Sequence, residues 1–514
     1  MAELSIPTSH SGRDVRRLVM EIDRRLEPLD RAILVAEWDL YTGRSSRGSD
    51  RWQLKRGALL SDVRLLEWVR RALQRSSPLE THRRLELLER ILLDAQVEQH
   101  PEIVRMRSAL TQRMVAFRPR WNGKKVERSR ITRIIQEDPN QANRKRAFYA
   151  LEPLYGPMEE LLRELVRARN ERARSQGFRS FAEMRLSFEG ITPERLEELA
   201  DSVIATAPSR MRAPEQRFRS DEPGAGWYPW DFSYTIRNAA PLPDRSFPQR
   251  PMLPRILKAV QRWGFRTDRM RFRVVFHDLP AGGLTLAPAP PRDVRILVHP
   301  RGGWPAYHVM FHEVGHAVHS ASIRAPGHLL SWHENIPGFG GFHEGIGKFF
   351  EEIAHHPDWL SAQPGVTREQ AEAFASERAA TDLWDAAWIV PWVRIEQTLY
   401  RNPSSNPESQ ARRDLRRMFG YDDYAGRSFV DSFYVDTPVY GQNYLLAILF
   451  HHHLVQTIRQ RFGDRVWPNL RVGPWLTREW FAPGSLYNWV PRVRAVTGRP
   501  FSAGPFQESF RSGR

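Results

Sequence analysis

Apolar residues recur at three- and four-residue spacing over residues 12–205. The stretches "VRRLVMEIDRRLEPLDRAILVAEW" and "MEELLRELVRARNERARSQ" show the pattern clearly. Side chains at this spacing lie on one face of an α-helix, so the pattern predicts amphipathic helices. We therefore expect residues 12–205 to form an N-terminal helical half.

The pattern changes after this half. Prolines interrupt residues 206–256 too often for long helices, which indicates a connecting region or the rim of a cleft. Short runs rich in β-branched residues then predict a small antiparallel sheet, and they read "RFRVVF", "GGLTLA" and "DVRILVHP". Helical spacing returns afterwards, as in "YLLAILFHHHLVQTIRQRFG", so we assign residues 257–505 to a second helical half. The chain is predicted to be one mainly α unit over residues 1–514.

Composition narrows the class of protein. The chain is 41% hydrophobic and 27% charged, which is typical of a soluble globular protein. It shows neither an apolar run long enough to span a membrane nor the apolar core of a signal peptide, so we expect a cytoplasmic protein with no membrane partner. Because the sequence contains no cysteine, any bound metal must be held by histidines and carboxylates.

The net charge of +17 raises the possibility of nucleic-acid binding. However, the arginines are dispersed and interleaved with acidic residues, as in "ERARSQGFRSFAEMR", and do not form one basic block. A basic helical protein that binds nucleic acid is therefore the weakest of three hypotheses about function.

One motif points to metal chemistry. The stretch "HVMFHEVGHAVHS" contains His312, Glu313 and His316 in the order H-E-x-x-H. Two histidines four residues apart share a helix face and can bind one metal ion. Glu313 points to another side of the helix, beside the position that a bound water would take, where it can act as a general base.

A catalytic zinc needs a third protein ligand. The stretch "IPGFGGFHEGIGKFFEEIAHH" predicts a helix that opens at about His343, with Glu344 in its first turn. Glu351 lies seven residues further along the same face and could orient a ligand histidine. The alternative is that Glu344 only interacts favourably with the helix dipole.

The motif "FHEVGHAVHS" resembles the zinc helix of the thimet oligopeptidase and oligoendopeptidase F family. "PGFGGFHEGIG" resembles the segment that carries the glutamate ligand in the angiotensin-converting enzyme family. "VRARNERARSQGFRSFAEMRL", "YPWDFSY", "PVYGQNYLLAIL" and "WFAPGSLYNW" are also similar to segments of these gluzincin-type peptidases. The resemblance implies a large helical metallopeptidase fold with a deep cleft between two helical halves, one zinc ion per chain beside the small sheet, and oligopeptide substrates.

Applied residue by residue, the resemblance implies that His312, His316 and Glu344 bind zinc and that Glu313 is the general base. It also implies that a tyrosine stabilises the oxyanion. Tyr440 and Tyr444 stand four residues apart at the start of an apolar helix, so both hydroxyls can face the cleft. We assign the oxyanion contact to Tyr444 and substrate positioning to Tyr440, the alternative being that both are core residues.

The sequence departs from these families at two positions. They place a histidine about ten residues before the second tyrosine, where "RSFVDSFYVDTPV" has none and Tyr434 is the nearest equivalent. Tyr434 therefore either replaces that donor or general peptidase activity is weak. Lys348 stands where the angiotensin-converting enzyme pattern has an aspartate, so it either pairs with a nearby glutamate or binds a substrate carboxylate.

Further candidates flank the motif. Ala281, Gly282 and Gly283 stand where the relatives have an edge strand that pairs with substrate backbone, although a plain hairpin turn explains the glycines equally well. His319 recurs in the oligopeptidase-type motif and is a candidate for a residue behind the zinc ligands.

The leading hypothesis is a zinc oligopeptidase or endopeptidase in which Glu313 activates a zinc-bound water. The second keeps the zinc site but assigns it one small or modified substrate, with weak general peptidase activity. The sequence does not indicate an oligomeric state.

Overall fold

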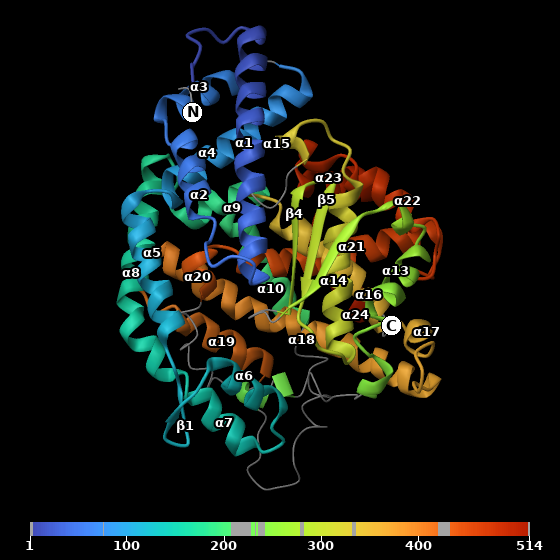
Figure 1. The fold of residues 1–514 in the computed structure, drawn as a ribbon. Coiled ribbons are helices and arrows are strands. Elements are labelled where there is room, and N and C mark those ends of the chain that lie inside the picture. Colours follow the sequence, from blue (N-terminus) through green and yellow to red (C-terminus); the bar gives the residue numbers. More distant parts are fainter. Residues whose placement is uncertain are drawn as a thin grey trace.

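A computed structural model describes residues 4–75, 77–206, 228–231, 233–234, 242–277, 282–331, 336–419 and 432–511. Helices dominate it, and long helices form the left side of the molecule in Figure 1. The N-terminal helices are α1 (Gly12–Tyr41), α2 (Asp50–Leu60), α3 (Val63–Leu73), α4 (Leu79–Glu98), α5 (Pro101–Ala116), α6 (Arg128–Glu137), α7 (Gln141–Tyr149), α8 (Glu152–Ser175), α9 (Phe181–Glu189) and α10 (Pro193–Thr206). A two-stranded ribbon, β1 (Arg120–Trp121) and β2 (Lys124–Lys125), interrupts them.

Side chains at the helix ends explain several of these boundaries. The Ser11 hydroxyl accepts a hydrogen bond from the Asp14 backbone N–H and so caps the N-terminus of α1. At the other end of the N-terminal helices, Gly190 ends α9 in the left-handed conformation, with φ of 78°. Local sequence therefore fixes where these helices begin and end.

The second half of the chain begins with short elements and a sheet. They are η1 (Pro229–Asp231), η2 (Asp244–Ser246), α13 (Met252–Gln261), η3 (Thr267–Arg269), β3 (Phe272–Phe276), β4 (Gly283–Ala289) and β5 (Asp293–Val298). All three expected strands are present. Most of the expected proline-rich connecting region lies outside the described residues, and its last residues already belong to α13.

The expectation of an antiparallel sheet is wrong in one respect. The strand order is β3-β5-β4, in which β4 pairs with β5 antiparallel while β3 pairs with β5 parallel. The tight connection between β4 and β5 makes them a hairpin, and β5 occupies the central place beside β3. The sheet is therefore mixed, and β4 forms one of its edges.

Helices complete the molecule after the sheet. They are α14 (Trp304–Ser322), α15 (His328–Ser331), α16 (Gly340–His355), α17 (Pro357–Leu360), α18 (Arg368–Arg401), α19 (Glu408–Phe419), α20 (Ser432–Asp436), α21 (Gly441–Phe462), α22 (Val472–Leu476), η5 (Thr477–Phe481), η6 (Gly484–Leu486), α23 (Trp489–Thr497) and α24 (Gly504–Arg511). Helix α16 packs between α14 and α21, and α14 also packs against β4 and β5. This central group carries the H-E-x-x-H motif.

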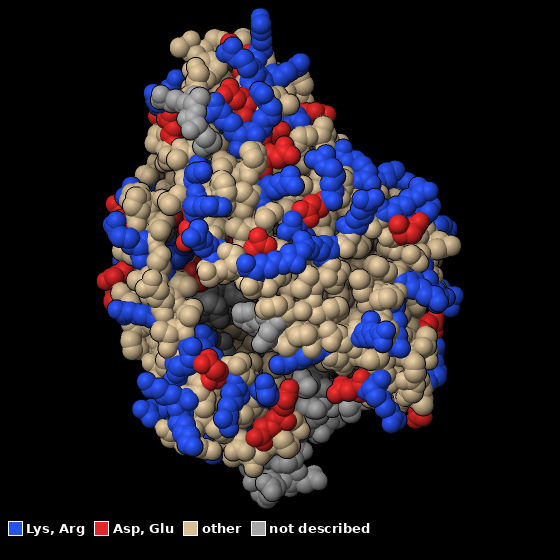
Figure 2. Space-filling view, viewed as in Figure 1, with Lys and Arg blue, Asp and Glu red and all other residues tan. Residues whose placement is uncertain are grey.

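One hydrophobic core connects the parts of the molecule. It extends from Val15 in α1 to Phe506 in α24 and includes the buried faces of α14, α16 and α21. On the face drawn in Figure 2 the surface is hollowed between the side formed by α5 and α8 and the side formed by the sheet. The hollow agrees with the expected cleft between two helical parts.

Neither the described helices nor the face drawn in Figure 2 suggest a membrane segment or a single basic patch. Within the described residues, no helix is both long and apolar enough to cross a membrane. Lys and Arg are spread over the face drawn in Figure 2, where they outnumber Asp and Glu, which lie scattered among them. This distribution gives the nucleic-acid hypothesis no support on that face.

Candidate metal centre

The two histidines of the motif lie on the same face of α14. The Nε2 atoms of His312 and His316 are 2.9 Å apart, as expected for side chains one helical turn apart. Their environment is the packed centre of the molecule, and His316 is only 6% exposed. Because burying a polar group without a partner is costly, two imidazoles in this position need a shared partner.

Helix α16 brings a carboxylate to these nitrogens. Glu344 Oε2 lies 3.3 Å from His312 Nε2. The helix begins at Gly340, three residues before the expected start, so Glu344 lies in the second turn and not in the first. The early start is stabilised by Glu189 of α9, which accepts a hydrogen bond from the Gly340 N–H at 2.9 Å.

His312, His316 and Glu344 thus converge on one point. One ligand atom from each lies within 4.8 Å of the other two, and no other group of three potential ligands does so among the described residues. In a tetrahedral zinc site with bonds of about 2.0–2.1 Å, ligand atoms lie roughly 3.3–3.5 Å apart. The two measured separations are close to this, and two imidazoles with one carboxylate are a donor set that zinc accepts. The residues present fit the expected metal.

The close approach of α16 to α14 depends on a glycine. A Cβ atom on Gly347 would lie 2.6 Å from His312 Nδ1, so any larger residue would collide with the imidazole. The position of the His312 ring is therefore set by a missing side chain on the neighbouring helix.

Glu351 holds the other side of His312. Its Oε1 lies 2.8 Å from His312 Nδ1, which directs Nε2 toward His316 and Glu344. Its Oε2 accepts a hydrogen bond from Lys348 at 2.7 Å and lies 3.0 Å from His308 Nε2. Burial favours the protonated acid, but His308 and Lys348 outweigh it and hold the pKa of Glu351 well below its usual range. Lys348 therefore takes the alternative of pairing with a glutamate.

The charge on His312 is linked to metal binding. Burial disfavours the imidazolium, yet hydrogen bonds with Glu344 and Glu351 outweigh burial and raise the pKa of His312 to about 10. A metal needs the neutral ring, so binding at neutral pH must displace this proton.

Glu313 lies between α14 and the edge strand β4. Its Oε2 accepts a hydrogen bond from the Thr285 hydroxyl at 2.7 Å. A Cβ atom on Gly283 would lie only 2.7 Å from Glu313 Cγ, so the strand can pass this close only with glycine there. Burial raises the pKa of Glu313 to about 7, which suits a group that takes up and returns a proton near neutral pH.

The two predicted tyrosines lie at the N-terminus of α21, beside the carboxylates. The Tyr440 hydroxyl donates a hydrogen bond to Glu344 Oε1 at 2.7 Å, so this residue holds a candidate ligand. The rings of Tyr440 and Tyr444 are 5.6 Å apart and nearly perpendicular. The pKa of Tyr444 is raised by burial first and then by the negative charges of Glu344 and Glu313. Its hydroxyl therefore stays a proton donor.

The remaining predicted residues are more distant from the ligands or undescribed. Tyr434 is buried, and its hydroxyl donates a hydrogen bond to the backbone carbonyl of Trp392 at 2.8 Å. His319 is fully buried, and its ring centroid lies 5.1 Å from those of Phe342 and Phe481. Gly282 precedes β4, and its carbonyl accepts a hydrogen bond from the His299 N–H. Ala281 lies outside the described residues.

Sequence reasoning missed two partners of the site. Thr285 shares a face of β4 with Gly283, and its place as the one polar residue in "GLTLA" was an available signal. His343 lies with its ring centroid 3.9 Å from that of His316. Its position beside the candidate ligand Glu344 was visible in the sequence, but its ring contact with His316 of α14 was not.

Comparison with family descriptions and with curated proteins gives no match. Solved structures do match over almost the whole chain. A carboxypeptidase from Pyrococcus furiosus aligns with a TM-score of 0.69 at 16% identity, covering 99% of each chain. Metallocarboxypeptidase 1 of Trypanosoma cruzi has the same TM-score of 0.69 at 16% identity, covering 98% of this chain and 99% of its own. An oligoendopeptidase F aligns with a TM-score of 0.69 at 15% identity, covering 98% of this chain and 92% of its own.

The chain has the fold of helical metallopeptidases. The prediction of a large, mainly α metallopeptidase fold is thereby confirmed, including its likeness to an oligoendopeptidase F. At this level of identity the likeness concerns the fold. The chemistry has to be argued from the residues of the site.

Proposed function

We propose that this protein is a zinc-dependent peptidase that hydrolyses oligopeptides. The observation that carries the proposal is the convergence of His312, His316 and Glu344 beside a buried general base, Glu313. A structural zinc site would need no such base and would be closed by four protein ligands. The metallopeptidase fold supports the same conclusion.

In this proposal, His312, His316 and Glu344 hold the zinc. When bound, zinc would acidify a water molecule and polarise the carbonyl of the scissile peptide. Glu351 keeps His312 oriented through Nδ1. Tyr440 does the same for Glu344 through its hydroxyl. Each of these two candidate ligands therefore has a partner that restricts its orientation, which lowers the entropy lost on binding a metal.

Glu313 moves the proton. Thr285 donates to its Oε2, which leaves Oε1 to accept a proton from the attacking water. The same oxygen then delivers the proton to the leaving amine nitrogen. A carboxylate with a pKa of about 7 can do both, although a bound cation would lower this value by favouring the charged form.

Tyr444 and the edge strand act on the substrate. The Tyr444 hydroxyl stays protonated beside Glu344 and Glu313, and it can donate to the oxyanion that forms at the scissile carbonyl. Strand β4 is an edge of its sheet, and an extended peptide can add to such an edge through backbone hydrogen bonds. Because Gly283 lies against Glu313, a peptide on this edge would pass next to the base.

Removal of residues from the C-terminus is a second candidate, because two of the similar structures are named carboxypeptidases. Such an enzyme needs a cation for the terminal carboxylate. Lys348 is tied to Glu351, so it does not favour this candidate. We retain internal cleavage of short peptides as the proposed activity, and the absent histidine keeps a narrow substrate range as the alternative.

The test combines metal analysis with cleavage of a quenched-fluorescent peptide library. We expect about one zinc per chain. Glu313→Gln should keep the metal and lower kcat by about 10²–10⁴-fold, the usual contribution of a general base. Glu352→Gln is the matched control, because this neighbouring glutamate of α16 bonds His451 and does not reach the site.

Mass spectrometry of the products locates the cleaved bond. Internal cleavage supports the proposed activity, and stepwise loss of C-terminal residues supports the second candidate. If Glu313→Gln cleaved peptides at the wild-type rate, the proposed mechanism would be overturned. Zinc binding without cleavage of any library peptide would overturn general peptidase activity and favour a single specialised substrate.

A further inference from the structure

A buried arginine links the N-terminal helices to the segment that carries the tyrosines. Arg169 of α8 belongs to the stretch "VRARNERARSQGFRSFAEMRL", to which the proposed chemistry assigns no role. It is 0% exposed. Neither the metal ligands nor Glu313 contact it, so its burial needs a separate explanation.

The guanidinium of Arg169 contacts three different parts of the molecule, one of which is the Tyr400 hydroxyl of α18 at 3.3 Å from Nη1. Toward α4, it forms a bidentate pair with Glu98, with Nε–Oε1 and Nη2–Oε2 distances of 2.7 and 3.1 Å. Toward α20, Nη1 donates to the Tyr434 carbonyl at 2.8 Å and Nη2 to the Val435 carbonyl at 2.7 Å. Only an arginine offers donors in this planar, forked arrangement.

The segment held in this way leads directly to Tyr440. Val439 has a positive φ of 56°, which is rare for a β-branched residue. Its backbone N–H donates to Glu396 Oε1 at 2.6 Å. One residue later, the Tyr440 hydroxyl reaches Glu344 at 2.7 Å. The path from the Arg169 contacts to the candidate ligand is therefore short and held by hydrogen bonds at each end.

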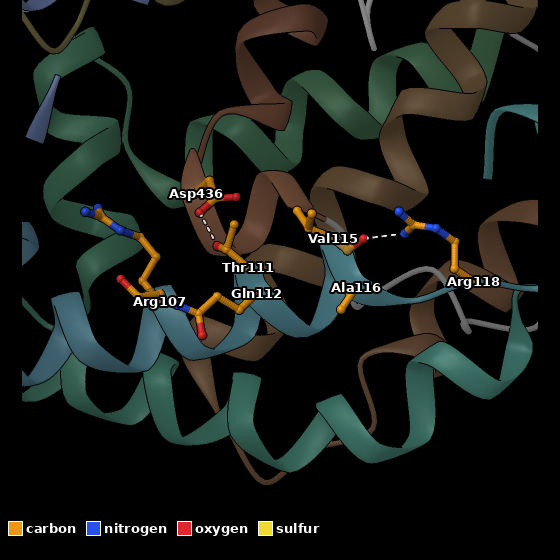
Figure 3. Close-up of a pocket in the computed structure, with 8 residues that line it drawn as sticks. Arg107, Thr111, Gln112, Val115, Ala116, Arg118 and Asp436 are labelled. Atoms are coloured by element: carbon orange, nitrogen blue, oxygen red, sulfur yellow. Dashed lines mark hydrogen bonds between the residues drawn. The ribbon is translucent and has the colours of Figure 1, made fainter. Parts of the chain in front are cut away.

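Val435 of α20 is buried in the hydrophobic core, but the last residue of the helix, Asp436, is exposed. Figure 3 shows Asp436 at that end, accepting a hydrogen bond from the Thr111 hydroxyl of α5 at 2.6 Å. A pocket of about 520 Å³ adjoins this contact and is lined by α5 residues, Arg118 and Asp436. The polar contacts of Thr111 and Arg169 therefore add to the burial of Val435 in holding α20 against α5 and α8.

We propose that the Glu98–Arg169 pair is a positioning clamp for the tyrosine segment. It fixes the backbone of α20 relative to the N-terminal helices, and through Val439 it sets Tyr440 on Glu344 and Tyr444 beside the reacting carbonyl. This inference rests on the proposed zinc peptidase function. Arg169 and Glu98 act through the tyrosines and are positioning residues, not catalytic ones.

Arg163 provides a matched control on the same helix. It is 9% exposed and pairs with Glu159 at 2.7 Å. It also donates to backbone carbonyls of Pro403 and Ser405, which belong to the loop after α18. Arg163 and Arg169 thus make the same kinds of contact, but only Arg169 contacts the tyrosine segment.

The experiment compares Arg169→Lys, Arg163→Lys, Tyr440→Phe and the double variant Arg169→Lys/Tyr440→Phe. Zinc affinity is measured by competition with a chelator, and kcat, KM and the melting temperature of the metal-free protein are measured in parallel. Lysine keeps the charge but cannot hold Glu98 and both carbonyls together. We expect Arg169→Lys to weaken zinc binding about tenfold, as typical for loss of a partner behind a ligand, and to lower kcat more than it raises KM.

Two outcomes separate positioning from a purely structural role. The double variant should bind zinc no more weakly than whichever single variant, Arg169→Lys or Tyr440→Phe, has the lower zinc affinity, because both changes remove the same Tyr440 contact. Arg163→Lys should also lower the melting temperature, although by less because Glu159 is exposed, while leaving zinc affinity unchanged. Additive losses in the double variant, or an equal loss of zinc affinity in Arg163→Lys, would overturn the clamp.

If Arg169→Lys does not fold, Thr111→Val replaces it. This variant keeps the side-chain shape and removes only the bond to Asp436, and we expect a loss of zinc affinity of about two- to threefold in the same direction. If zinc affinity and kcat both stayed at their wild-type values, the clamp would be contradicted.

The proposed function and the clamp fail in different measurements. The proposed function fails if the wild-type protein binds no zinc or cleaves no peptide. The clamp fails if the wild type binds zinc and the variants bind it equally well and turn over equally fast.

Discussion

The proposed zinc ligands and the two tyrosines meet at Glu344, but different forces position them. His312, His316 and Glu344 come from two helices packed so closely that Gly347 is needed at their contact. Tyr440 follows a short helix that is tied to the N-terminal helices by hydrogen bonds and borders a pocket. Close packing tolerates little displacement, whereas a few polar ties can be loosened one at a time.

This difference divides the chemistry between the two regions. Close packing suits metal ligands, whose separations must hold to a few tenths of an ångström. Polar ties suit groups that act on the substrate, because these can adjust as a peptide enters. We therefore expect substitutions in the packed region to act mainly on zinc affinity. Substitutions in the tied region should act on turnover and, where they disturb the bond from Tyr440 to Glu344, on zinc affinity as well.

The largest expected effect concerns Tyr444. Replacing it by phenylalanine removes the proposed donor to the oxyanion and should lower kcat about 10²–10³-fold. KM and zinc content should stay close to those of the wild type. Steady-state kinetics with one cleavable peptide and metal analysis measure this. A variant that lost zinc in proportion to activity would show that the tied region also supports the metal through Tyr444.

Glu98→Gln tests the hydrogen-bonded region through the free energy of unfolding. Burial favours protonated Glu98, but Arg169 and Arg107 outweigh it and lower its pKa from the ordinary value of 4.5. A lowered pKa stabilises the fold above that ordinary value, and this contribution is lost as the pH falls through the lowered pKa. At pH 7 the variant should lose about 3 kcal/mol of unfolding free energy, as expected when one partner of a buried pair is removed.

The difference between Glu98→Gln and wild type should shrink below pH 4.5, since a protonated glutamate resembles a glutamine. Urea unfolding at several pH values measures it. Glu160→Gln is the control, because its pair with Arg167 is exposed and should contribute less than about 1 kcal/mol. A constant difference across the acid range would show that the charge of Glu98 contributes little to stability.

Gly347→Ala tests the packed region with a single methyl group. The new Cβ would collide with the His312 imidazole, so zinc affinity should fall about 10–100-fold. Gly156→Ala in α8 is the control, because nothing lies within 4 Å of a Cβ there. Chelator competition measures both. Unchanged zinc affinity in Gly347→Ala would show that α14 and α16 can separate, and the proposed contrast between the two regions would not hold.

Much of this molecule could be predicted from local sequence. Helical spacing indicated the helices on both sides of the sheet, and the motif placed His312 and His316 on one helix face. Glu344 and Glu351 were predicted on a common helix from their spacing, although the helix starts earlier because Glu189, distant in sequence, binds Gly340. The mixed sheet was not predicted, since period-two alternation indicates strands and not the direction in which they pair.

The sequence alone determined which side chains can do the chemistry, because residues four or seven apart on a helix share a face whatever surrounds them. Tertiary structure decided which of those side chains meet. It set Thr285 against Glu313, Tyr440 on Glu344, and Arg169 between Glu98 and α20. These partners lie between 28 and 266 residues apart in the chain. Local spacing carries no information about such pairs, because they form only when separate helices and strands pack around one core.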